Sequence, residues 1–118
     1  MRKILLNMEF LGSLKKYVAI KQNAQNHDLT KIRKRILKLE KELESDSNNV
    51  SFLVQLYGCY VEISDIPKKI EYMEKMVKLR PKDSYPLQQL ADIYSNELDD
   101  MKMGKYYQDR ANRISKFL

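Results

Sequence analysis

Residues 65–81 read Asp-Ile-Pro-Lys-Lys-Ile-Glu-Tyr-Met-Glu-Lys-Met-Val-Lys-Leu-Arg-Pro, and they follow Leu-Val-Gln-Leu-Tyr-Gly-Cys-Tyr at residues 53–60. The Leu-x-x-Leu-x-x-x-Tyr spacing of residues 53–60 returns in Leu-Gln-Gln-Leu-Ala-Asp-Ile-Tyr at residues 87–94. A fixed period of about 34 residues is typical of stacked helical hairpins, and most such folds bind other molecules. The repeat therefore predicts a binding protein.

Composition predicts one soluble domain. The chain has 118 residues, of which 43% are hydrophobic and 32% are charged, too apolar for a disordered chain. It has no apolar run of the ~20 residues that cross a bilayer. Residues 1–6 begin like a signal peptide, but Asn7 and Glu9 interrupt the apolar run, so we expect no export. Cys59 is the single cysteine, which fits a reducing compartment. We therefore expect a cytoplasmic protein.

The hydrophobic pattern predicts an all-α fold of six helices in three antiparallel hairpins. The expected helices cover about 4–22, 29–44, 50–63, 66–79, 84–97 and 99–118. The polar run 45–49 offers caps for the third helix, and Asp83 or Ser84 for the fifth. Pro67 and Pro86 fit the first turns of the fourth and fifth helices, where a missing N–H costs little.

Residues 50–83 resemble the tetratricopeptide repeat in length and pattern. Leu53, Leu56 and Tyr60 occupy the family's characteristic positions in its first helix, and Pro81 occupies the position after its second. The sequence departs from the family's small residues at three positions, which are Tyr57, Lys69 and Met76. Residues 84–114 match again, through Leu87, Leu90, Ala91, Tyr94, Gly104, Tyr107 and Ala111, with one extra residue placed at Asp99-Asp100, and the repeat with its terminal helix covers 84–118.

Residues 4–44 read as a degenerate first repeat. Ile32, Ile36, Leu39 and Leu43 precede Ile66, Ile70, Met73 and Val77 by one full period of the repeat. One hairpin cannot cover its own apolar face, and about three are needed for stability. We therefore expect residues 1–118 to form one short α-solenoid domain of three stacked hairpins, similar to a tetratricopeptide-repeat protein.

The resemblance implies that the first helix of each hairpin lines a groove for a protein partner or a peptide. The corresponding residues are Ser51, Val54, Gly58, Val61, Glu62, Tyr85, Gln88, Asp92, Ser95 and Asn96. They include no Lys or Arg, so the carboxylate clamp of chaperone-binding members is not expected. A neutral or basic peptide would suit this polar groove, with Tyr85 as an apolar anchor. The alternative is that these side chains are merely solvated.

The C-terminus adds a second expected contact. The predicted last helix ends the chain with apolar side chains and no capping helix after it. These residues are Ile114, Phe117 and Leu118. We expect this terminal face to associate with a second copy of the chain, as a homodimer, or with a larger partner.

A basic run supplies an alternative function, as an accessory subunit docking on RNA or a ribonucleoprotein. Residues 1–44 carry 11 Lys/Arg and 5 Asp/Glu, whereas residues 45–118 carry 11 of each. The basic residues of the second helix are Lys31, Arg33, Lys34, Arg35, Lys38 and Lys41. Such a face can neutralise phosphates of RNA or of an anionic membrane, although no aromatic residue between Lys31 and Lys41 could stack on bases. Residues 29–43 also suit a short coiled coil, but two heptads are fewer than usual.

Nothing in the sequence predicts an enzyme, a cofactor or a metal. His27 stands alone in a polar loop, and Cys59 is expected to be a buried structural thiol. The methionines, among them Met73, Met76, Met101 and Met103, are expected to pack in the core. Phosphate-binding glycine loops, zinc motifs and a recognisable nucleophile–base pair are all missing from the sequence. The leading hypothesis is a non-enzymatic adaptor or scaffold subunit of a larger complex.

Overall fold

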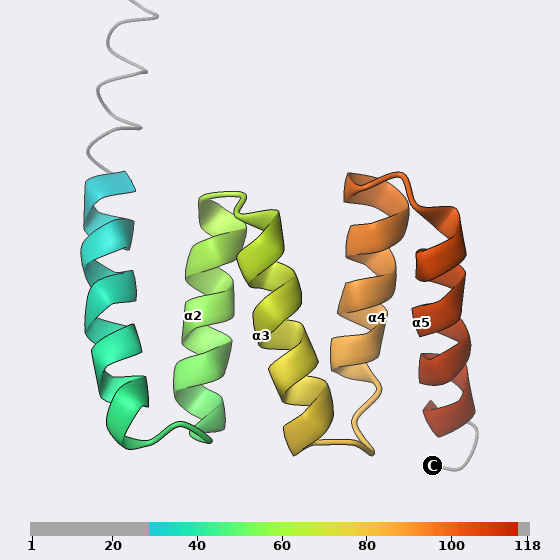
Figure 1. The fold of residues 1–118 in the computed structure, drawn as a ribbon, viewed down its shortest axis with the longest axis horizontal. Helices are drawn as coiled ribbons and strands as arrows, with labels where there is room; N and C mark the ends of the chain where they lie inside the picture. The colour runs from blue at the N-terminus through green and yellow to red at the C-terminus, as the bar shows by residue number, and fades with distance from the viewer. Residues whose placement is uncertain (1–28, 116–118) are drawn as a thin grey trace, which may run out of the picture.

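The computed structural model describes residues 29–115, which fold into helices joined by short turns (Figure 1). These described residues contain no strand, so the all-α prediction is confirmed for this part of the chain. The predicted helix over 4–22 lies outside the described residues, as do His27, Phe117 and Leu118.

Consecutive helices run antiparallel, each beside the next in chain order (Figure 1). A helix over residues 29–45 comes first. It is followed by α2 (Val50–Glu62), α3 (Ile66–Leu79), α4 (Tyr85–Asp92), the π-helical segment η1 (Ile93–Glu97), which continues α4, and α5 (Met101–Ser115). The bounds of α2 and α3 agree with the predicted ones to within a residue.

Side-chain caps fix where several of these helices begin. Asn49 accepts a hydrogen bond from the backbone N–H of Phe52 at 3.1 Å, and Asp65 accepts one from Lys68 at 3.1 Å. Asp100 accepts one from Met103 at 3.1 Å. Each cap satisfies an N–H that has no partner inside the helix.

The start of α4 distinguishes the two capping candidates that the sequence left open. The Asp83 carboxylate accepts a hydrogen bond from the backbone N–H of Tyr85 at 2.9 Å, whereas Ser84 forms no side-chain cap. Pro86 lies in the first turn of this helix, as predicted.

One apolar core runs through all the described helices. Leu53, Leu56 and Met73 of the first complete hairpin are less than 2% exposed, as are Leu87 and Leu90 of the second. The helix over 29–45 contributes three buried residues to the same core, Ile36, Leu39 and Leu43. Burying a side chain of this size stabilises the fold by about 2 kcal/mol, so this shared core holds the row of helices together.

A pair of stacked tyrosines recurs in each complete hairpin. Tyr60 of α2 stacks on Tyr72 of α3 with ring centroids 5.5 Å apart and planes 24° apart. Tyr94 of η1 stacks on Tyr107 of α5 at 5.5 Å and 14°. Tyr94 follows Tyr60 by one period of the sequence repeat, and Tyr107 follows Tyr72 by one period and a single inserted residue. The sequence period therefore coincides with a structural period.

A glutamate from the preceding helix accompanies each stack. Glu40 accepts a hydrogen bond from the hydroxyl of Tyr60, and Glu74, one period further along, accepts one at 3.4 Å from Tyr107. The donor is the first tyrosine of one stack and the second tyrosine of the other. Each stack is thus tied to the helix before its hairpin through a carboxylate.

The extra residue of the second hairpin lies in η1, so its predicted position at Asp99-Asp100 is wrong. The backbone N–H of Asp65 bonds to the carbonyl of Tyr60 in the first hairpin, and the N–H of Asp100 bonds to that of Tyr94 in the second. One more residue therefore separates the partners in the second hairpin. A π turn holds one residue more than an α turn, and η1 absorbs the insertion there.

The turns themselves match. Ser64, with φ 56°, and Asp99, with φ 51°, both adopt the left-handed conformation, and each directly precedes the aspartate that caps the next helix. The two turns therefore have the same backbone form, which leaves no room for an insertion between Leu98 and Asp100.

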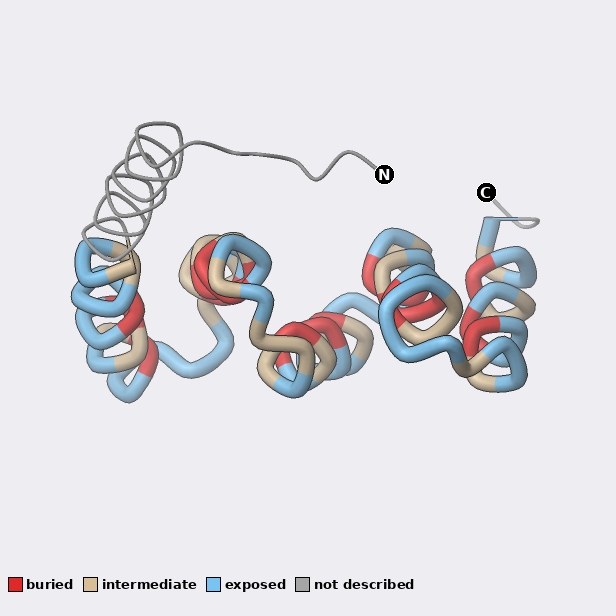
Figure 2. The backbone as a smooth tube through the Cα atoms, turned by 90° about the horizontal axis from the view of Figure 1, so that it is seen from above, coloured by how far each residue is buried: buried red, intermediate tan, exposed pale blue. Residues whose placement is uncertain are grey.

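The row of helices is not flat. Figure 2 shows α3 displaced to one side of its neighbours α2 and α4. A hydrogen bond of 3.1 Å from the Tyr57 hydroxyl of α2 to the Gln89 side chain of α4 connects these two helices directly. The groove residues predicted from the resemblance belong to these two helices and η1.

Candidate functional site

A surface hollow of about 350 Å³ lies between the α4–η1 helix and α5. Four of the predicted groove residues line it, which are Gln88, Asp92, Ser95 and Asn96. The opposite wall comes from α5, and the complete lining adds Ala91, Met101, Gly104, Lys105, Gln108 and Asp109. The structure therefore gathers the α4–η1 part of the predicted groove into a defined concave site.

The close approach of α5 to η1 depends on Gly104. A Cβ atom at this position would lie 1.8 Å from the Ser95 Oγ atom and 3.3 Å from the Ala91 carbonyl oxygen. A larger residue would therefore require Ser95 to move, and with it one side of the hollow. Gly104 and Ala91 are themselves buried.

The walls of the hollow are polar and carry both charges. Asn96 donates a hydrogen bond to Asp92 at 2.5 Å on one wall. Lys105 and Asp109 form an ion pair of 3.0 Å on the other, where their side chains are 77% and 47% exposed. Asp92 has no cationic partner among the described residues. The site therefore offers one unneutralised carboxylate next to amide groups that can donate and accept hydrogen bonds.

An ion pair between a buried lysine and a more exposed glutamate fixes η1 against α3. Lys69 is 7% exposed, and its Nζ atom donates to both carboxylate oxygens of Glu97, at 2.8 and 2.6 Å. Glu97 is the last residue of η1, so this contact anchors the end of the π segment to α3. Ser95 and Asn96, which line the hollow, are thereby held on a braced segment.

The predicted groove residues of α2 lie outside the hollow. Ser51, Val54, Val61 and Glu62 are exposed, and Gly58 is half-buried. Tyr85, at the start of α4, is 49% exposed and does not line the hollow. These six predicted groove residues therefore do not belong to the hollow.

Tyr57 of α2 is a buried, neutral hydrogen-bond donor. Burial raises the pKa of Tyr57 to about 12, and the electrostatic influence of Tyr85, Glu97 and Asp92 acts in the same direction. Its hydroxyl therefore stays protonated at neutral pH, in keeping with its bond to Gln89.

The predicted basic face is fully accessible. Lys31, Arg33, Lys34, Arg35, Lys38 and Lys41 are all exposed on the helix over 29–45. Arg35 donates a hydrogen bond of 3.4 Å to Gln55 on α2. These residues lie on a different helix from the hollow and form a separate surface. Of the predicted terminal face, Ile114 is half-buried and packs against the core.

Cys59 is buried, as predicted, and burial raises the pKa of its thiol. A thiol in this state is a weak nucleophile. Met73 and Met76 are core residues, but the prediction is wrong for Met101, which is 66% exposed at the rim of the hollow. In residues 29–115, no three His, Cys, Asp or Glu side chains are close enough together to hold a metal ion.

The α5 wall of the hollow was not predicted from the sequence. Met101, Lys105, Gln108 and Asp109 follow steps of four, three and one, a pattern that marks them as an outward helical face. The resemblance implies a groove lined by the first helix of each hairpin, so it predicts no groove residue on α5, the second helix of its hairpin.

No protein-family model, no curated protein and no solved structure matches this chain. In the part of the chain that the structure describes, none of the helices combines the length and the apolar character that a bilayer-spanning segment requires.

Proposed function

We propose that this protein is a non-enzymatic adaptor that binds an extended segment of a partner protein in the hollow between α4–η1 and α5. The recurrence of the Tyr60–Tyr72 and Tyr94–Tyr107 stacks supports a tetratricopeptide-like stack of hairpins, with residues 4–44 supplying the first of them. In this proposal the protein is one subunit of a larger complex, and its stack of hairpins is the rigid scaffold that holds the binding surface.

The observation that carries the proposal is the hollow itself. It has an accessible volume of about 350 Å³ and rests on a braced segment. Its polar lining suits the amide groups of a peptide backbone, because Gln88, Asn96 and Gln108 can both donate and accept hydrogen bonds. Met101, which is exposed at the rim, offers adaptable apolar contact to a side chain of the partner.

The charge of the hollow favours a neutral or basic segment. Asp92 has no cationic partner within the described residues, whereas Lys105 is neutralised by Asp109. A Lys or Arg of the bound segment would therefore find one carboxylate available. The described lining contains no Cys or His, and Ser95 forms no hydrogen bond with Asp92 or Lys105, so the lining suits binding rather than catalysis.

Selection from a display library of random dodecapeptides, using the full chain as bait, tests the proposal. We expect selected peptides to be neutral or basic, and to bind the Asp92→Lys variant at least about tenfold more weakly, which corresponds to about 1.4 kcal/mol. Glu44→Lys, which reverses the charge of an exposed residue on another helix, is the matched control and should leave the affinity unchanged.

Tyr85→Ala adds a second comparison, because it removes the exposed aromatic side chain beside the hollow. We expect a smaller loss than for Asp92→Lys. Peptides that bind Asp92→Lys and Tyr85→Ala as tightly as the natural chain would contradict the proposed site.

A further inference from the structure

The outward face of the helix over 29–45 carries a charge pattern that the adaptor proposal does not use. Lys31, Lys34, Lys38 and Lys41 follow one another at steps of three, four and three, so they share one helical face. At a rise of about 1.5 Å per residue they span roughly 15 Å. Arg33 and Arg35 lie on its two flanks. We refer to these six residues as the basic face.

Within residues 29–115, no carboxylate neutralises the basic face. All six side chains are exposed, and none forms an ion pair within residues 29–115. Elsewhere in the same range Lys68, Lys69 and Lys105 each have a carboxylate partner. The basic face therefore keeps its charge available to another molecule.

The order of charges along this helix does not serve helix stability. The helix ends at residue 45, and Glu42 and Glu44 occupy its last turn, where the helix dipole disfavours negative charge. Lys38 precedes Glu42 by one helical turn, which is the weaker orientation for a helical ion pair, and no such pair forms. The clustering of cations ahead of these acids therefore gives the end of this helix neither dipole nor ion-pair stabilisation.

The apolar side of this helix argues against a membrane as the ligand of the basic face. Ile36, Leu39 and Leu43 are buried in the core, so they cannot enter a lipid interface. Leu37 is 68% exposed, but it is a single apolar side chain beside the lysines. An interfacial helix needs an extended apolar face, so this surface suits a polyanion in water better than a bilayer.

The composition of the basic face indicates which polyanion fits. It has no aromatic side chain to stack on the bases of a single strand, and four of its six residues are lysines, which bind phosphates as point charges. In an A-form RNA duplex the major groove is deep and narrow, so its bases are out of reach and its phosphates remain accessible. We infer that the basic face binds the phosphate backbone of double-stranded RNA without reading its sequence.

Fluorescence anisotropy with the full chain and a labelled RNA duplex of about 20 base pairs tests this inference over a series of salt concentrations. Binding should weaken steeply with salt, because each phosphate contact releases counterions. The variant Lys34→Gln/Lys38→Gln/Lys41→Gln should reduce the slope of log K against log[salt] by about 3, since each phosphate-contacting lysine contributes about 1. The affinity should fall at least about tenfold at low salt.

The matched control changes net charge equally at another place. Lys78, Lys82 and Lys102 are exposed and lie on other helices and loops, so Lys78→Gln/Lys82→Gln/Lys102→Gln should keep nearly the whole salt slope. Circular dichroism of both triple variants should show the helical content of the natural chain. An equal loss in the control would mean that binding follows net charge alone, and it would overturn the inference.

Three further probes test the choice of polyanion. A duplex DNA of the same sequence, a single-stranded oligouridine of the same length, and vesicles of phosphatidylserine should all bind more weakly than duplex RNA. The inference would be overturned if any of these three probes bound as tightly as duplex RNA. It would also be overturned if the binding of duplex RNA did not respond to salt. This test is independent of the adaptor proposal, because the Asp92→Lys variant should bind duplex RNA at least as well as the natural chain does.

Discussion

The hairpins α2–α3 and α4–η1–α5 share their tyrosine stacks and turns, but they differ where their two helices touch. The second hairpin has small residues at the contact positions, Ala91, Gly104 and Ala111. The residues at the equivalent positions of the first hairpin are Tyr57, Lys69 and Met76. All six residues are buried. The same hairpin fold thus accommodates both small and large residues at equivalent contacts between its two helices.

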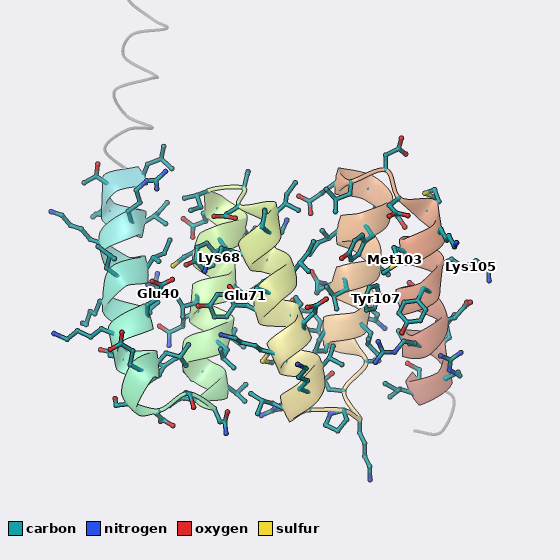
Figure 3. The ribbon with its side chains drawn as sticks, in the orientation of Figure 1. Glu40, Lys68, Glu71, Met103, Lys105 and Tyr107 are labelled. Atoms are coloured by element: carbon teal, nitrogen blue, oxygen red, sulfur yellow. The ribbon has the colours of Figure 1, made fainter. Side chains whose placement is uncertain are left out.

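The different sizes of these contact residues give the two hairpins different structural roles. In the first, large side chains reach beyond their own hairpin, since Tyr57 bonds to Gln89 and Lys69 to Glu97. In the second, small side chains bring α5 close to η1 and leave the hollow at the surface. The first hairpin therefore braces the second, which forms the hollow that we propose as the binding surface. Figure 3 shows the side chains of both hairpins in the same view, with Tyr107 labelled on the second.

The largest effect should come from the leucines that the two hairpins share. Leu56 and Leu90 are equivalent and completely buried. We expect Leu56→Ala and Leu90→Ala to lower the free energy of unfolding by about 3 kcal/mol each, within the roughly 2–5 kcal/mol usual for such cavities. Urea denaturation measures both. A cost below about 1 kcal/mol in either variant would indicate that its hairpin does not share the common core.

The next largest effect should come from the Lys69–Glu97 ion pair that joins α3 to η1. Glu97→Ala leaves the buried ammonium group of Lys69 without its partner, so we expect a loss of about 2 kcal/mol in unfolding free energy. Lys69→Met replaces the charge with a flexible apolar side chain, and it should change stability by less than about 1 kcal/mol. Thermal and urea unfolding of the two variants provide the comparison. An equal cost for both would argue against a desolvated cation.

Alkaline pH should destabilise both hairpins. Burial raises the pKa of Tyr57 and of Tyr107 to about 12, against 10.0 for free tyrosine. The unfolded chain therefore loses these protons first, so the contribution of these two hydroxyls to stability is constant below pH 10 and falls as the pH rises toward 12. We expect Tyr57→Phe to make this fall shallower, while costing about 1 kcal/mol at pH 7 through its lost bond to Gln89.

Melting temperatures measured from about pH 8 to pH 12 check this expectation. The natural chain should show a falling melting temperature above pH 10, and Tyr107→Phe should reduce the fall as Tyr57→Phe does. A melting temperature that stays constant to pH 12 would contradict the burial of both hydroxyls.

The smallest effect contrasts two helical glycines. A Cβ at Gly58 would meet no atom within 4 Å, so Gly58→Ala should stabilise the protein by about 0.5–1 kcal/mol through helix propensity alone. Gly104→Ala gains the same propensity but must displace the Ser95 side chain, and it should be neutral or destabilising. Differential scanning calorimetry can resolve the two. Equal stabilisation by both would show that α5 is not held tightly against η1.

The sequence predicts much of the fold because its signals are local. The caps at Asn49 and Asp100 and the first-turn prolines lie within a few residues of the helix starts they determine. The sequence repeat likewise predicts the equivalence of Tyr60 and Tyr94. The π segment was missed because side-chain spacing does not distinguish an inserted residue in a helix from one in the following turn.

The candidate site is less predictable because it depends on distant partners. Lys69 meets Glu97 from another hairpin, and the α5 wall meets α4–η1 only after the second hairpin has closed. Four groove residues of α4–η1 were predicted through the resemblance, whereas Lys105 and Gln108 required the packed structure. The charge of the basic face, in contrast, could be predicted from the sequence alone because its residues share one helix.

The equivalence of the two hairpins is tested most directly by nuclear Overhauser effects between tyrosine rings of the full chain. The centroid separation of 5.5 Å in both stacks predicts cross-peaks between Tyr60 and Tyr72 and between Tyr94 and Tyr107. Cross-peaks for the first pair without the second would mean that the residue inserted in η1 breaks the repeat, and the account of a periodic stack would be contradicted.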